Sequence, residues 1–130
     1  KRDMLGVKVR TLNKYGAVSR AVVEEMAAGA LKKSGADFSV AISGIAGPDG
    51  GTDDKPVGTV WLAWHVGGQL DASLAVLPGS RRDVRAAAVT LALQGLLVRI
   101  RRWLAEQPSP AALSTAAQKK ELTQLLDDSE

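Results

Sequence analysis

The chain has 130 residues, a formal net charge of +3 and no cysteine. A chain of this length can bury the core of one domain without cross-links, and the lack of thiols excludes disulfides, thiolate metal sites and a cysteine nucleophile. No apolar run reaches the ~18 residues of a membrane-spanning helix, so we expect a cytoplasmic protein with no membrane partner.

Two helices are predicted ahead of the first strand. Residues 1–5 have the pattern of a last helical turn that Gly6 ends, which leads us to expect further chain before them. A short helical turn is expected at residues 10–14. From Arg20 to Lys33 the apolar residues recur every three or four positions behind a capping Ser19, which indicates an amphipathic helix.

Period-two alternation predicts three strands. The first covers Asp37–Ser43, and the second, Val57–Val66, follows after a loop of about a dozen residues. We expect one face of the second strand to lie in the core, namely Val60, Leu62, Trp64 and Val66. The pair Gly67-Gly68 is a hairpin signal that leads into a third alternating run, residues 70–76.

A long helix is predicted to follow the hairpin. Ser80 and Asp83 have the spacing of a capping box, and helical periodicity continues from Arg81 to about Glu106. Its sheet-facing positions recur at steps of four and three, as Val84, Ala88, Leu91, Gly95 and Val98. Three arginines of its distal half are interpreted as a solvated face, namely Arg99, Arg101 and Arg102.

These elements predict an α/β fold, a layered α/β/α sandwich. We expect a mixed sheet with at least three strands and the long C-terminal helix packed on it. Pro108 and Pro110 mark a break, so residues 1–106 are assigned to one domain and residues 107–130 to a linker and charged tail.

The loop between the first two strands, Gly44–Thr52, is rich in glycine. Glycines allow successive N–H groups to converge on an anion, and ligands of α/β folds often lie where a strand ends. A connector without a ligand fits this composition equally well, because the spacing matches neither the P-loop nor the dinucleotide fingerprint.

Other candidate residues are weaker. Arg81 and Arg85 lie one turn apart near a helix N-terminus, where they could contact a phosphate or form a solvated face. Three aspartates of the loop are interpreted as turn carboxylates rather than metal ligands: Asp49, Asp53 and Asp54. His65 is interpreted as structural or partly exposed, and Trp61 is the one candidate for stacking a nucleic-acid base, a partner that the weak net charge disfavours.

Three segments of the sequence resemble the C-terminal domain of CinA, competence/damage-inducible protein A, and the related nicotinamide-nucleotide amidases. They are Gly16–Ser19, the stretch Ser43–Gly51 continuing to Lys55–Val60, and Gly79–Arg81 with Val84 and Arg85. The resemblance covers Lys1 to about Arg99. It implies hydrolysis of the carboxamide of nicotinamide mononucleotide to nicotinic acid mononucleotide and ammonia, in pyridine-nucleotide recycling, with no required metal and no cofactor.

The resemblance also implies a serine nucleophile in a Glu-Ser-Cys-Thr-Gly-Gly segment, assisted by the lysine and tyrosine of a Tyr-Ser-Asn-x-x-Lys segment. The serine segment and that tyrosine do not occur in this sequence, whereas Lys1 matches the lysine because Met4-Leu5-Gly6-Val7 continues the family pattern. We therefore expect the complete parent protein to be the amidase and this chain to be inactive alone.

Two groups of residues are the candidates for holding the nucleotide. The first lines the site with amides and a hydroxyl: Ser43, Gly44, Ile45, Ala46, Gly47, Pro48, Gly50 and Gly51. The second, Arg81 with Arg85, is placed at the anionic end of the nucleotide. The alternative is a nucleotide-binding or partner-binding module without catalysis. A homo-oligomer is also expected, because chain missing before Lys1 would leave apolar surface uncovered.

Overall fold

The computed structural model describes residues 6–107, so the expectations for residues 1–5 and for the tail beyond Gln107 lie outside the described residues. Among the described residues, those up to Ile100 belong to one compact unit and residues 101–107 belong to a second. In chain order the elements are α2 (Val9–Tyr15), α3 (Arg20–Ser34), β1 (Phe38–Gly44), β2 (Thr59–Val66), β3 (Gln69–Val76) and α4 (Arg81–Glu106). These bounds confirm the predicted helices, strands and long final helix.

The three strands form one sheet in the order β1-β2-β3. Both pairings are antiparallel, and the register runs from Phe38 opposite Val66 to Gly44 opposite Val60. A turn at Gly67 and Gly68 joins β2 to β3, as the sequence predicted. The predicted α/β layers are confirmed, but no parallel pair of a mixed sheet occurs among the described strands, because each is joined to its sheet neighbour without a crossover.

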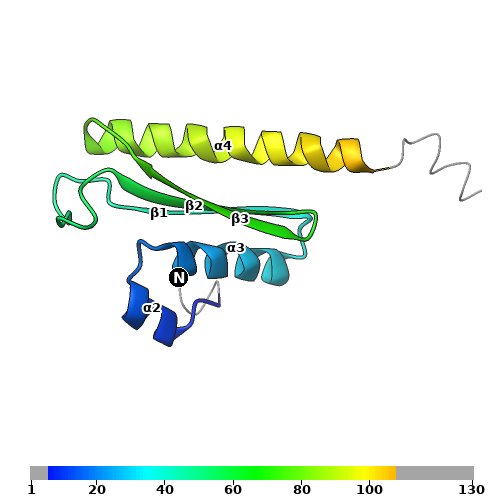
Figure 1. The fold of residues 1–130 in the computed structure, drawn as a ribbon, viewed down its shortest axis with the longest axis horizontal. Coiled ribbons are helices and arrows are strands. Elements are labelled where there is room, and N and C mark those ends of the chain that lie inside the picture. Colours follow the sequence, from blue (N-terminus) through cyan, green and yellow to red (C-terminus); the bar gives the residue numbers. More distant parts are fainter. Residues whose placement is uncertain (1–5, 108–130) are drawn as a thin grey trace, which may run out of the picture. The chain divides into compact units, whose positions relative to one another are not determined.

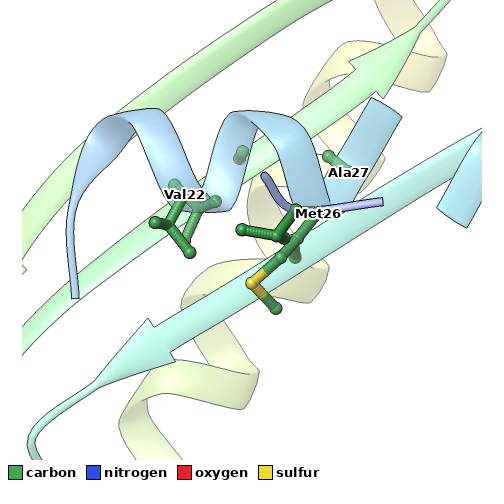
Figure 2. Close-up of a cluster of buried hydrophobic side chains, with 7 residues drawn as sticks. Val22, Met26 and Ala27 are labelled. Atoms are coloured by element: carbon green, nitrogen blue, oxygen red, sulfur yellow. The ribbon is translucent and has the colours of Figure 1, made fainter. Parts of the chain in front are cut away.

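Helix α3 covers one face of the sheet (Figure 1). The Ser19 hydroxyl accepts a hydrogen bond from the Val22 amide at 3.3 Å, and Gly35 ends the helix in the left-handed conformation, so both predicted ends are confirmed. Figure 2 shows the buried cluster of this layer, which consists of Val7, Val22, Val23, Met26, Ala27, Ala41 and Ala63. The predicted amphipathic character of α3 is therefore what attaches it to the sheet.

Helix α4 covers the opposite face and completes the α/β/α layers (Figure 1). Its buried residues Val84, Ala88 and Ala92 follow one another at steps of four and pack on Val60, Leu62 and Trp64 of β2. The predicted core face of β2 is confirmed. The other face of β2 is partly buried as well, with Thr59 and Ala63 buried and Trp61 and His65 half-buried, because the central strand lies between two helices.

Arg99 is not part of a solvated face, so that interpretation was wrong. Its guanidinium lies 3.9 Å from the Trp64 ring centroid, and its Nε donates to Asp71 at 3.1 Å. Arg99 is on the side of α4 that faces the sheet, where an edge-strand carboxylate and an indole ring are within reach. Val98 was assigned to the packing stripe but is 51% exposed, since it lies off the row of buried residues at steps of four.

Candidate functional site

The loop of residues 45–58 and the first turn of α4 lie at the same end of the sheet (Figure 1). The antiparallel register explains this, because Gly44 lies opposite Val60 and Thr59 lies opposite Val76. The end of β1, the start of β2 and the end of β3 therefore meet, and the chain segments that follow them are brought together.

The loop is held at its two ends by its own backbone. Ile45 N–H donates to the Thr59 carbonyl at 2.9 Å, and Gly58 N–H donates to the Ile45 carbonyl at 2.7 Å. A tight turn closes where Thr52 N–H donates to the Lys55 carbonyl at 2.9 Å. None of these bonds uses the N–H groups of Asp49, Gly50 and Gly51 in the exposed tip of the loop, so these three groups could donate to an anion.

The start of α4 supports the loop from one side. Arg81 Nη1 donates to the Gly47 carbonyl at 3.2 Å, which leaves the other N–H groups of the guanidinium available. The predicted capping box is confirmed, since Asp83 N–H donates to the Ser80 hydroxyl at 3.2 Å and Ser80 N–H donates to the Asp83 carboxylate at 3.0 Å. The helix start that carries Arg81 is thus defined by its own local bonds.

A hollow of about 210 Å³ lies where the loop meets α4. Apolar side chains and two guanidinium groups line it, and its residues are Ile42, Gly44, Ala46, Val60, Arg81, Val84, Arg85 and Ala88. A second hollow of about 410 Å³ is lined by Arg81, Arg82 and Arg85. The structure thus brings Arg81 and Arg85 together with two predicted loop residues, Gly44 and Ala46. The other six predicted residues line neither hollow, namely Ser43, Ile45, Gly47, Pro48, Gly50 and Gly51.

On the α3 side, the end of β1 and the loop contact the end of α2 and the turn that follows it. Ser43 is 3% exposed, and its hydroxyl donates to the Ala17 carbonyl at 2.8 Å. Lys55 Nζ donates to the Tyr15 carbonyl at 2.8 Å. The Ser43 hydroxyl is therefore directed into the protein rather than toward the hollow. Lys55 was not singled out from the sequence, where its only signal was its place in the stretch Lys55–Val60.

The remaining candidates are less informative. Lys1 lies outside the described residues, so its proposed role stays a prediction. Within residues 6–107 no group of three or more histidine, aspartate or glutamate side chains could hold a metal ion. His65 is half-buried with its Nδ1 atom unpartnered, and Trp61 packs against the α3 core cluster instead of offering a free ring for stacking.

No helix among residues 6–107 combines the length and the apolar composition that a transmembrane segment requires.

Comparisons with known proteins agree on one family. A family model described as the CinA C-terminal domain matches residues 1–100. The chain is 54% identical over 98 residues to a CinA-like protein of Akkermansia muciniphila, which covers 75% of this chain and 24% of that protein. It is 52% identical over 97 residues to the nicotinamide-nucleotide amidohydrolase PncC of Escherichia coli K12, which covers 74% of this chain and 59% of that enzyme.

Solved structures give the same result. A competence damage-inducible protein A of Klebsiella pneumoniae superposes with a TM-score of 0.75 at 44% identity, over 79% of this chain and 64% of that one. A CinA superfamily protein of Escherichia coli superposes with a TM-score of 0.72 at 43% identity, over 77% and 58%. The chain therefore spans about three fifths of the length of the PncC enzymes that it matches.

Proposed function

The chain belongs to the CinA C-terminal domain family, and from this premise we propose that it forms the nucleotide-holding part of a nicotinamide-nucleotide amidohydrolase. The reaction is hydrolysis of the carboxamide of nicotinamide mononucleotide to nicotinic acid mononucleotide and ammonia. This proposal is based on the sequence identity of about one half between this chain and several proteins named nicotinamide-nucleotide amidohydrolase. The hollow between the loop and α4 supports it, since its lining joins cations to an apolar wall.

In this proposal the phosphate of the nucleotide binds Arg81 and Arg85. Both line the two adjoining hollows, and Arg81 is already oriented by its bond to the Gly47 carbonyl. Guanidinium groups suit a phosphate because they present several N–H donors in one plane. The apolar wall, which includes Val60 and Val84, accommodates the less polar part of the ligand. The exposed N–H groups of Asp49, Gly50 and Gly51 are proposed as further hydrogen-bond donors.

Bond breaking requires a nucleophile that attacks the carboxamide carbon and a base that removes its proton. The family resemblance assigns the first role to a serine in a segment that this sequence does not contain, and the second to Lys1. We therefore propose that the 130 residues bind the nucleotide but do not hydrolyse it.

The first test compares binding with turnover. Titration calorimetry with nicotinamide mononucleotide is expected to show binding, while a coupled assay for ammonia stays at the level of a blank without protein. The amidohydrolase PncC of Escherichia coli serves as the positive control for the ammonia assay. Sustained ammonia release by the chain would contradict the inactivity proposed here and would require a nucleophile among its own residues.

The second test addresses the phosphate contacts. Arg81→Met and Arg85→Met are each expected to weaken nicotinamide mononucleotide binding about tenfold, the lower end of the range for a charge-assisted hydrogen bond, because both side chains are exposed. Calorimetry of nicotinamide riboside, which lacks the phosphate, should show no loss for Arg85→Met and a smaller loss for Arg81→Met, which also removes the bond to the Gly47 carbonyl.

Arg82→Met is the matched control, since Arg82 is adjacent in α4 but does not line the smaller hollow. A change of less than about threefold is expected for it, as for a solvated charge. Equal losses for the nucleotide and the riboside, or equal losses at all three arginines, would refute the assignment of the phosphate to Arg81 and Arg85.

A non-catalytic nucleotide-binding or partner-binding module is the second candidate. The missing serine segment favours it, and the exposed apolar side chains Leu93 and Leu97 of α4 provide the surface that the predicted self-association would bury. Nucleotide binding by the chain combined with ammonia release by the complete parent protein would decide against this candidate.

A further inference from the structure

The ammonium group of Lys55 lies at the C-terminal end of α2. Its Nζ donates to the carbonyl of Tyr15, the last residue of that helix, at 2.8 Å. The final carbonyls of a helix have no partner within the helix and carry partial negative charge, so a cation is favourable there. The bond joins residues 40 positions apart, and it therefore connects two segments that no local interaction would hold together.

The backbone of Lys55 is itself fixed. Its N–H donates to the Thr52 hydroxyl at 3.0 Å, and its carbonyl accepts from Thr52 N–H at 2.9 Å. The turn of residues 52–55 therefore behaves as one unit, and the lysine side chain ties that unit to the end of α2.

The glycine-rich loop is thus held from two layers. On the α3 side, Ser43 and Lys55 donate to the carbonyls of Ala17 and Tyr15, one from before the loop and one from its far end. On the α4 side, Arg81 donates to the carbonyl of Gly47. Of the two hydrogen bonds on the α3 side, only the one from Lys55 holds the part of the loop that follows its exposed tip.

We propose that Lys55 is a positioning residue, whose bond to the Tyr15 carbonyl holds the loop of residues 45–58 in the conformation that binds the nucleotide. The part of this inference that concerns the nucleotide rests on the proposed function. The hydrogen bond from Lys55 to the Tyr15 carbonyl does not depend on the proposed function, because it is a contact within the chain. Removing the ammonium group leaves the start of the loop anchored through Ser43 and takes away the bond between the turn of residues 52–55 and α2, so that only backbone bonds within the loop and to its two ends hold its distal half.

Hydrogen exchange of individual amides, measured by NMR, tests the tie without any ligand. In Lys55→Met the amides of Gly16, Thr52 and Gly58 are expected to exchange about fivefold faster, the change for one hydrogen bond of typical net strength. All three have an acceptor in the folded chain. Lys55→Arg keeps a cationic donor and should restore most of the protection.

Lys14→Met is the matched control. The Lys14 ammonium lies 5.2 Å from the centroid of the Tyr15 ring, so it contacts the same residue but not through its carbonyl. Exchange at Thr52 and Gly58 should stay at the wild-type rate in this variant. Equal exchange at these amides in Lys55→Met and wild type would overturn the proposal, whether or not the nucleotide binds.

Calorimetry with nicotinamide mononucleotide on the same proteins tests the link to binding. Lys55→Met should bind about threefold to tenfold more weakly while its melting temperature stays close to that of wild type, and Lys55→Arg should recover affinity. Faster exchange with unchanged affinity would overturn the positioning role. Faster exchange in Lys55→Met, with no nucleotide binding by any of the proteins, would refute the proposed function. It would still support the role of the Lys55–Tyr15 hydrogen bond in holding the loop.

Discussion

Adding one methyl group at Gly58 is expected to lower the free energy of unfolding by about 3 kcal/mol or more, the sum of backbone strain and overpacking. Gly58 has a φ of +97°, which residues with a side chain rarely adopt. A Cβ atom there would also collide with the backbone carbonyl oxygen of Leu77. That carbonyl belongs to the backbone, so it cannot move aside by rotating a side chain. Urea denaturation of Gly58→Ala measures the loss.

The collision at Gly58 has a consequence for the site. Gly58 donates to the Ile45 carbonyl at 2.7 Å and accepts from Leu77 N–H at 2.8 Å, so it joins the start of the loop to the segment that leads into α4. A backbone shift at this residue moves the loop and the start of α4 apart. We therefore expect nucleotide affinity to fall together with stability.

Gly68→Ala is the control for backbone strain alone. Gly68 has a φ of +79°, but a Cβ atom there would meet nothing within 4 Å. Gly68→Ala should lower the free energy of unfolding by about 1 kcal/mol, the penalty of a left-handed backbone conformation without a steric collision. If the two substitutions cost the same, the close approach of Leu77 to Gly58 would not be what makes Gly58 necessary.

Gly95→Val is the second substitution with a large expected effect. Gly95 lies in the interior of α4, where glycine is ordinarily destabilising by up to about 1 kcal/mol. A Cβ atom at this position would lie 2.6 Å from Cε2 and 2.9 Å from Nε1 of Trp64. The substitution should lower the free energy of unfolding by about 3 kcal/mol, and the melting temperature by roughly 10 °C.

The large expected effect at Gly95 follows from the contacts that surround the Trp64 indole. Trp64 Nε1 donates to the Ala92 carbonyl at 2.9 Å, and the Arg99 guanidinium stacks on the ring while it pairs with Asp71. Moving the ring away from Gly95 breaks the indole hydrogen bond and the stacking together. An indole N–H that is left buried without an acceptor adds its own cost of about 1–3 kcal/mol.

Gln94→Val places the same side chain on the preceding, exposed residue of α4. It should change stability by less than about 0.5 kcal/mol, since surface substitutions away from special features seldom do more. A comparable loss in both variants would mean that valine is unfavourable anywhere in this helix, and not because of the contact with Trp64.

Several features of the candidate site followed from the sequence. The capping pair Ser80 and Asp83 fixed the start of α4, and with it the place of Arg81 and Arg85. The predicted end of the first strand at Ser43, one residue before its observed end at Gly44, located the start of the glycine-rich loop. These predictions succeeded because each depends on residues within a few positions of one another.

Other features could not be predicted in this way. The direction of the Ser43 hydroxyl, the bond from Lys55 to the Tyr15 carbonyl and the bond from Arg81 to the Gly47 carbonyl join residues 26, 40 and 34 positions apart. No local periodicity encodes such contacts. They depend on how the layers stack, and the identity of a lysine or serine within a motif does not indicate which distant group it will hydrogen-bond.

The sequence alone determined the helices, the strands, the hairpin and the family resemblance, because caps, alternation and short motifs are local properties of the chain. Only the tertiary structure decided that the second face of β2 is partly buried too and that Arg99 stacks on Trp64 rather than facing solvent. It also decided which loop residues meet Arg81 and Arg85. The physical reason is that burial and pairing are set by the neighbouring layers, which are distant in sequence and are brought close only when the sheet is covered on both sides.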